Sequence, residues 1–64
     1  MKTIKEINNN GLVLILESVS NKEGSVLGYM ISKIENGLRR YLSAPISMTQ
    51  AEEHLAFFQN AYKQ

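Results

Sequence analysis

The chain has 64 residues, with seven Lys and Arg against six Glu, and its formal charge of +1 creates no strong field toward nucleic acid or membranes. This length predicts one small domain, residues 1–64. The sequence lacks Cys, which excludes disulfides, thiolate metal ligands and a thiol nucleophile. With 44% apolar and 20% charged residues, the composition is typical of a globular protein.

The N-terminal part contains no convincing targeting signal. Lys2 and Lys5 precede the apolar run from Leu12 to Leu16, an order that secretory signals share. The run stops at Glu17 without a small-residue cleavage site, and a bilayer span takes about 20 apolar residues. We therefore expect a cytoplasmic protein.

Turn-forming residues divide residues 1–45 into short segments. Asn and Gly tolerate the positive φ of tight turns, and they cluster at 8–11, at 21–24 and at Asn36-Gly37. The Asn36-Gly37 pair favours a two-residue type I′ hairpin loop. The apolar-rich runs between these turns are predicted as strands: 12–19, 26–35 and 38–44.

The first residues of the chain fit two structures. Ile4 and Ile7 have the spacing of one helical turn, whereas the segment 2–7 would also serve as an edge strand. We favour the strand. The predicted fold is α+β, a three- or four-stranded antiparallel β-meander with one C-terminal α-helix packed on one face. The position of the strand 12–19 stays open, either beside 26–35 or at the far edge.

A helix is predicted over residues 48–62. Its apolar residues recur at spacings of three and four, so they form one core-facing stripe. The stripe consists of Met48, Ala51, Leu55, Phe58 and Tyr62. Phe57 lies about 160° around the helix from Leu55, on the side that faces water.

Two residues compete to cap this helix. Ser47 can cap it with Gln50 as its capping-box partner, and Ile46 against Ala51 would then form a hydrophobic staple. Thr49 with Glu52 is the rival cap, two residues later.

Both faces of the predicted sheet are apolar. A two-residue loop at Asn36-Gly37 pairs Lys33 with Arg40 and Ile31 with Leu42, and paired residues share a face. One face then holds Leu27, Tyr29, Ile31, Leu38, Leu42 and Ala44. The other holds Val26, Gly28, Met30, Ser32, Ile34, Arg39, Tyr41 and Ser43. One helix covers one face, so the N-terminal segment, a second copy or a partner must cover the other.

This surplus apolar surface predicts a protein-interaction module. The candidate interface residues are Val26, Met30, Ile34, Tyr41 and Phe57. We expect a non-catalytic accessory or inhibitor protein, of the kind that phages and mobile elements carry, that binds a protein partner or itself. A homodimer is favoured, since domains of this length often gain stability by associating.

The sequence is poor in catalytic groups. His54 is the single histidine of the sequence, and the sequence indicates neither a partner to orient it as a general base nor a cleft around it. Glu52 and Glu53 diverge by about 100° around the helix, so they do not form a carboxylate pair. Gly24 and Gly28 match neither a P-loop nor a dinucleotide fingerprint. We expect no enzyme activity, metal, cofactor or small-molecule substrate.

Nucleic-acid binding is the alternative function. From Val26 to about Asn60 the chain resembles the three-strand-plus-helix domains that open many phage integrases, which implies a sheet lying in the major groove. The residues that carry this resemblance are Asn36, Gly37, Leu38, Arg39 and Arg40 with Ser47, Ala51, Glu52 and Leu55. Arg39, Tyr41 and Ser43 are the candidate contacts on one predicted face. The charge of +1 departs from such domains, which are usually basic.

Overall fold

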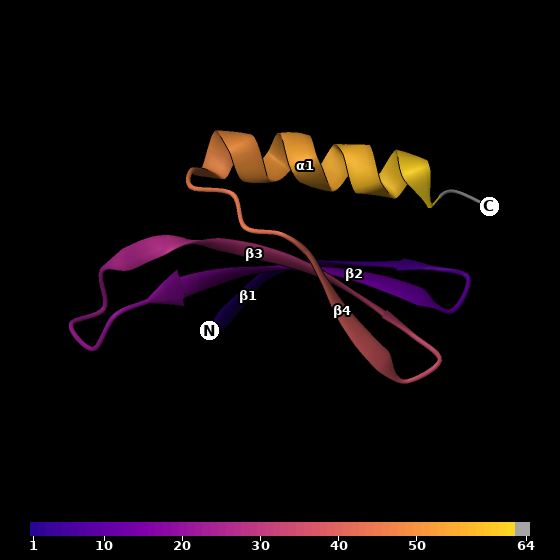
Figure 1. Ribbon diagram of the computed structural model, residues 1–64, viewed down its shortest axis with the longest axis horizontal. Helices are drawn as coiled ribbons and strands as arrows, with labels where there is room; N and C mark the ends of the chain where they lie inside the picture. The colour runs from indigo at the N-terminus through magenta and orange to yellow at the C-terminus, as the bar shows by residue number, and fades with distance from the viewer. Residues whose placement is uncertain (63–64) are drawn as a thin grey trace.

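The computed structural model describes residues 1–62, which form an antiparallel sheet followed by a helix (Figure 1). The elements are β1 (Lys2–Asn9), β2 (Leu12–Ser20), β3 (Val26–Glu35), β4 (Leu38–Ser43) and α1 (Met48–Ala61). The strands lie in chain order, β1-β2-β3-β4, and each pairs with the next. The predicted α+β meander is confirmed, and its first segment is an edge strand.

Two Asn-Gly turns connect the outer strands to the central ones. Asn10 and Gly11 have φ of 52° and 88°, and Asn36 and Gly37 have φ of 54° and 78°. Positive φ at both central residues defines the type I′ turn, whose twist matches that of the strands. Of the segment 8–11 that was predicted as a turn, the last two residues therefore form it, because Asn8 and Asn9 pair with β2.

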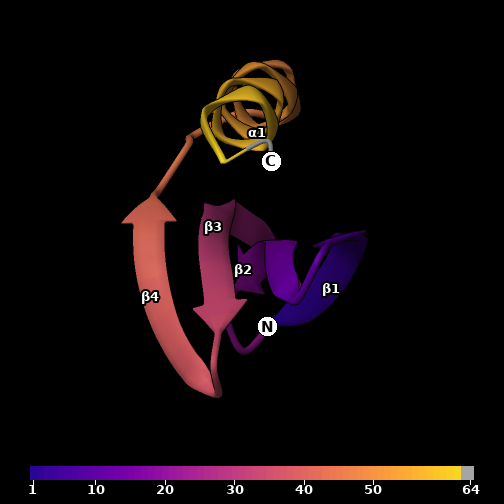
Figure 2. The same ribbon diagram turned by 90° about the vertical axis from the view of Figure 1, so that its right-hand side faces the viewer.

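Helix α1 lies along one face of the sheet, over the central strands β2 and β3 (Figures 1 and 2). The buried core between them consists of Leu12, Leu14, Leu16, Ile31, Ala51 and Leu55. Partly buried residues surround it: Ile7, Tyr29, Leu42, Met48, Phe58 and Tyr62. All five residues of the predicted helical stripe belong to these two sets, so the core face of the helix is confirmed.

Ser47 caps α1, which decides between the two predicted caps. Its hydroxyl accepts a hydrogen bond from the Gln50 N–H at 3.1 Å. The Gln50 side chain reaches back one residue further than a capping box requires and accepts from the Ile46 N–H at 3.0 Å. The predicted staple between Ile46 and Ala51 is wrong. Pro45 turns inward and binds the Tyr29 N–H through its carbonyl, which leaves Ile46 79% exposed.

A β-bulge changes the pairing of β3 with β4. The register follows the prediction from the turn as far as Ser32 and Tyr41, but Ile31 then pairs with Ser43 instead of Leu42. The prediction is wrong from this point because the bulge inserts one extra residue into β4. The strand also ends at Ser43, so Ala44 lies outside it.

The helix is shorter than the strands that it covers. Fourteen helical residues span about 21 Å, whereas the ten residues of β3 span about 33 Å. The start of β3 consequently extends beyond the first turn of α1 (Figure 1). Leu27 was predicted on the covered face, but it is 65% exposed because the helix does not reach it.

Candidate interaction surface

No helix or strand of residues 1–62 covers the second face of the sheet (Figure 2). We call it the open face. The strand registers place ten residues of β2, β3 and β4 on this face: Val13, Ile15, Glu17, Val19, Gly28, Met30, Ser32, Ile34, Arg39 and Tyr41. Six of the ten are aliphatic or aromatic, so one helix does leave an apolar-rich face without a second layer, as the strand patterns predict.

A polar cluster closes the centre of the open face. Arg39 forms an ion pair with Glu17 and lies 3.4 Å from the Ser32 hydroxyl. The guanidinium carbon is 5.4 Å from the centre of the Tyr41 ring, a cation–π contact. The Glu17 side chain is only 10% exposed, and Ser32 is fully buried. Long side chains of the face itself therefore shield its centre from water.

An apolar area lies at the end of the sheet that α1 does not reach. Its residues line a shallow hollow beside Pro45 or adjoin it. They are Val19, Val26, Leu27, Met30 and Ile46. We call this set the overhang patch. The hollow joins Val19 and Met30 of the open face to Leu27 and Ile46 on the helix side. The apolar surface therefore continues around the end of the sheet.

The structure brings four of the five predicted interface residues onto this surface. Val26 is 53% exposed and Tyr41 is 62% exposed, while Met30 and Ile34 are half-buried between neighbouring side chains. Phe57 is 67% exposed, but it belongs to α1 on the other side of the sheet. Leu27 and Ile46 were not predicted at this surface, because the exposure of Leu27 depends on the limited length of the helix and that of Ile46 on the inward turn of Pro45.

The candidate nucleic-acid contacts are separated. Arg39 and Tyr41 lie together on the open face. Ser43 lies on the helix side, where its hydroxyl is 3.0 Å from His54 Nδ1. Its predicted place beside Arg39 is wrong, because the bulge in β4 reverses the side to which Ser43 points.

His54 lies at the boundary of the core, as its position beside the helical stripe predicts. With Ser43, Glu53, Phe57 and Phe58 it lines an open hollow between α1 and β4. Phe57 packs edge-on against Phe58 at 5.4 Å. Among residues 1–62 no group of three or more His, Cys, Asp or Glu is arranged to hold a metal ion.

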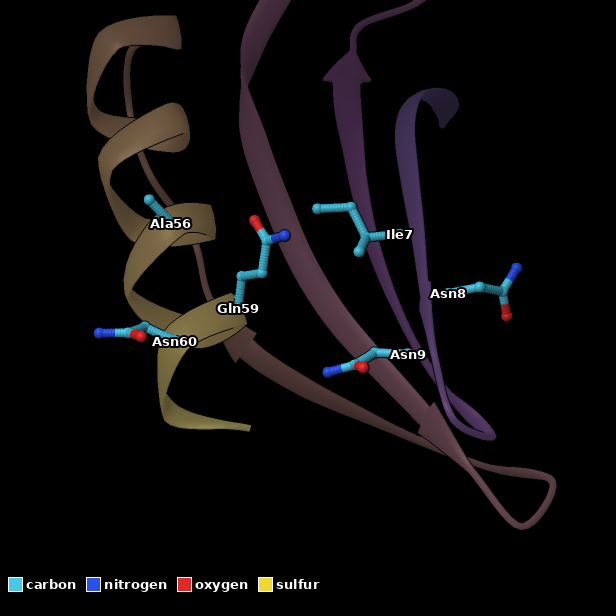
Figure 3. A pocket seen from close by; sticks show the side chains of 6 residues that line it. All are labelled: Ile7, Asn8, Asn9, Ala56, Gln59 and Asn60. Carbon is cyan, nitrogen blue, oxygen red and sulfur yellow. The ribbon is translucent and has the colours of Figure 1, made fainter. Parts of the chain in front are cut away.

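A groove separates α1 from the edge strand β1, because the helix lies over the two central strands. It is lined by Ile7, Asn8, Asn9, Ala56, Gln59 and Asn60 (Figure 3). Ile7 and Gln59 point into the gap, whereas Asn8 points away. The Asn9 side-chain amide donates to the Tyr62 carbonyl at 3.2 Å and ties β1 to the end of the helix.

Comparison of the chain with protein-family models, with curated proteins and with solved structures finds no match. Within residues 1–62, no helix combines the length and the hydropathy that crossing a membrane requires. Function is therefore inferred from the surfaces described above.

Proposed function

We propose that the chain is a non-catalytic interaction module that binds a protein partner or a second copy of itself through the open face and the overhang patch. The observation that carries this proposal is a sheet with apolar residues on both faces and a single covering helix. Four side chains of this surface are more than half exposed: Val26, Leu27, Tyr41 and Ile46. Exposed apolar surface of this kind marks interaction sites.

The chemistry of the surface favours a protein partner. Met30 adapts its shape to a partner, and Tyr41 combines a large ring with a polar tip. The ion pair between Glu17 and Arg39 neutralises the charge at the centre of the face. Selection of the partner therefore depends on shape and apolar contact more than on long-range attraction.

A second copy of the chain is the occupant that we favour. A domain of this length has a small core, and association is a common source of further stability. Two open faces can meet without charge repulsion at their centres, because each carries one cation and one anion that are already paired.

The surroundings of His54 support the non-catalytic part of the proposal. Its Nδ1 atom is hydrogen-bonded to Ser43, and within residues 1–62 no carboxylate is paired with either side chain. A serine nucleophile with a histidine base also needs a group that orients the histidine and donors for the oxyanion.

The first experiment is light scattering over a concentration series, with a control variant at Phe57 that matches the exposure of Tyr41. Met30→Glu and Tyr41→Glu place charge on the open face. Phe57→Glu places the same charge at an equally exposed aromatic residue on α1. We expect the wild type and Phe57→Glu to dimerise, and the two open-face variants to remain folded monomers by circular dichroism. Dimers of all the variants would exclude the open face as the contact surface.

A monomeric wild type at every concentration would exclude the second copy as the occupant. Capture from a cell extract then tests for a different partner. The proposal requires that the wild type and Phe57→Glu retain the same protein and that Tyr41→Glu does not. Loss of capture by Phe57→Glu alone would place the binding site on α1 instead.

Nucleic-acid binding receives less support. The Arg39 charge is compensated by Glu17, and Ser43 lies on the other side of the sheet. Titration with duplex and single-stranded DNA at low salt tests this alternative. Affinity that falls steeply with salt would contradict a protein-binding role, since phosphate contacts release counterions.

A further inference from the structure

The two type I′ turns contain a chemically labile dipeptide. Of the six Asn in the sequence, Asn10 and Asn36 are the ones followed by Gly. Both dipeptides are exposed to water. Glycine carries no side chain that would hinder an attack by its backbone nitrogen on the preceding Asn side chain.

The geometry points to Asn10 and Asn36 as sites of spontaneous deamidation, with the change at Asn10 loosening strand β1. The backbone nitrogen of the following Gly loses its proton and attacks the side-chain carbonyl carbon of Asn. A new C–N bond closes a five-membered succinimide, and the side-chain nitrogen leaves as ammonia. Water then opens the ring at either carbonyl, which yields aspartate or isoaspartate.

A single peptide rotation makes this attack feasible in the folded chain. In a type I′ turn the Gly nitrogen lies away from the Asn side chain. Rotating the central peptide gives a type II′ turn, in which Asn has φ and ψ of about +60° and −120° and Gly about −80° and 0°. The Asn φ of 52° or 54° already fits, and Gly accepts either sign of φ. At this ψ the Gly nitrogen eclipses the Asn Cβ, as ring closure requires.

The remaining Asn residues that the structure describes are restrained. Asn21 holds the loop between β2 and β3, where its side-chain oxygen accepts from the N–H groups of Glu23 and Ser25 at 2.9 and 3.0 Å. The other three lie inside regular elements, Asn8 and Asn9 in β1 and Asn60 in α1. Their backbone cannot rotate without breaking the ladder or the helix.

The two sites differ in their structural consequence. An isoaspartyl link adds one carbon to the main chain, adds a negative charge and no longer fits a two-residue turn. Within residues 1–62, strand β1 pairs with β2 alone, packs Ile7 against the core and has one side-chain hydrogen bond to another element, from Asn9 to Tyr62. Strand β4 has two side-chain bonds to other elements, since Arg39 binds Glu17 of β2 and Ser43 binds His54 of α1. Conversion at Asn10 is therefore the more disruptive of the two.

The test is incubation of the folded chain at mildly alkaline pH, followed by peptide mapping with mass spectrometry. We expect Asn10 and Asn36 to convert several-fold faster than Asn21. The variants Asn10→Gly and Asn36→Gly remove the reacting amide and fit the positive φ of the turns. Hydrogen exchange should become faster in β1 of the aged wild type and of aged Asn36→Gly. Exchange in aged Asn10→Gly should stay unchanged.

A sample unfolded in urea serves as the reference. Conversion of both sites in urea and of neither in the folded chain would overturn the proposal, because the native turn would then block the rotation. Equal conversion at Asn21 would also overturn it. Conversion at Asn10 without faster exchange in β1 would refute the predicted loosening.

Discussion

The centres of the two sheet faces are shielded from water in different ways. On the covered face, Leu14, Leu16 and Ile31 lie beneath α1 and are almost entirely removed from water. On the open face, Ser32 is equally buried, but the Arg39 side chain and its partner Glu17 cover it. An added layer of apolar side chains closes one face, and the charged groups of the sheet itself close the centre of the other.

This difference shows how a small sheet can remain folded with one helix. Burial under the helix removes apolar area from water, which is the larger source of stability. The ion pair on the open face shields the centre of the sheet and leaves the apolar groups around it accessible. The covered face therefore contributes most of the buried apolar area, and the open face keeps apolar side chains accessible to water.

The largest expected effect is a cavity beneath the helix. Leu16→Ala removes a fully buried side chain between β2 and α1. We expect the free energy of unfolding to fall by about 2–5 kcal/mol in urea denaturation. The matched variant Ile46→Ala, at a residue 79% exposed, should leave stability nearly unchanged. Equal losses for the two variants would contradict the difference between the faces.

The next effect concerns the ion pair that shields the centre of the open face. Arg39→Met leaves Glu17 without its partner in a site where the Glu17 side chain is only 10% exposed. We expect a loss of about 1–3 kcal/mol, the cost of a buried polar group without a partner. The control Arg40→Met, at the exposed neighbour, should stay within about 0.5 kcal/mol of the wild type.

A double variant sharpens this prediction. Removing both charges with Glu17→Met and Arg39→Met should recover most of the stability, because no unpaired charge remains. If the double variant lost as much unfolding free energy as the two single variants together, the two charges would not act as a pair.

A smaller effect is expected at the start of α1. Ser47→Ala removes the side chain that accepts from the Gln50 N–H. The free energy of unfolding should fall by about 1 kcal/mol, as for other N-caps. Thr49→Ala should cost less, because Thr49 lies inside the first turn and does not cap the helix. The reverse order in thermal denaturation would assign the cap to Thr49.

The smallest effect is expected on the water-facing side of α1. Phe57→Ser changes a ring that is 67% exposed and contacts Phe58 at its edge. We expect the stability to change by no more than about 0.5 kcal/mol in the same urea titration. A larger loss would show that Phe57 belongs to the core.

Patterns between neighbouring residues predicted most of the fold. The pair Asn36-Gly37 and the helical stripe each depend on residues close in the chain, and both were confirmed. The bulge at the end of β4 was not predicted. It places Ser43 against His54 and is followed by the bond from Tyr29 to Pro45, contacts that no local pattern specifies.

The candidate surface could be predicted only in part. Alternation along the strands placed Met30 and Tyr41 on a face without a cover, which the registers confirm. The exposure of Leu27 depends on where the helix stops above the sheet, a relation between distant elements. The ion pair of Glu17 with Arg39 likewise joins residues 22 positions apart.

By itself, the sequence determined the three strands from residue 12 onward, the tight turns, the helix and the apolar character of both sheet faces. These properties follow from backbone preferences and periodicity within a few residues. Only the tertiary structure decided how far the helix reaches, where β4 shifts its register and which charges pair. Those features depend on packing between elements that are far apart in the chain. Patterns within a few residues contain no information about such contacts.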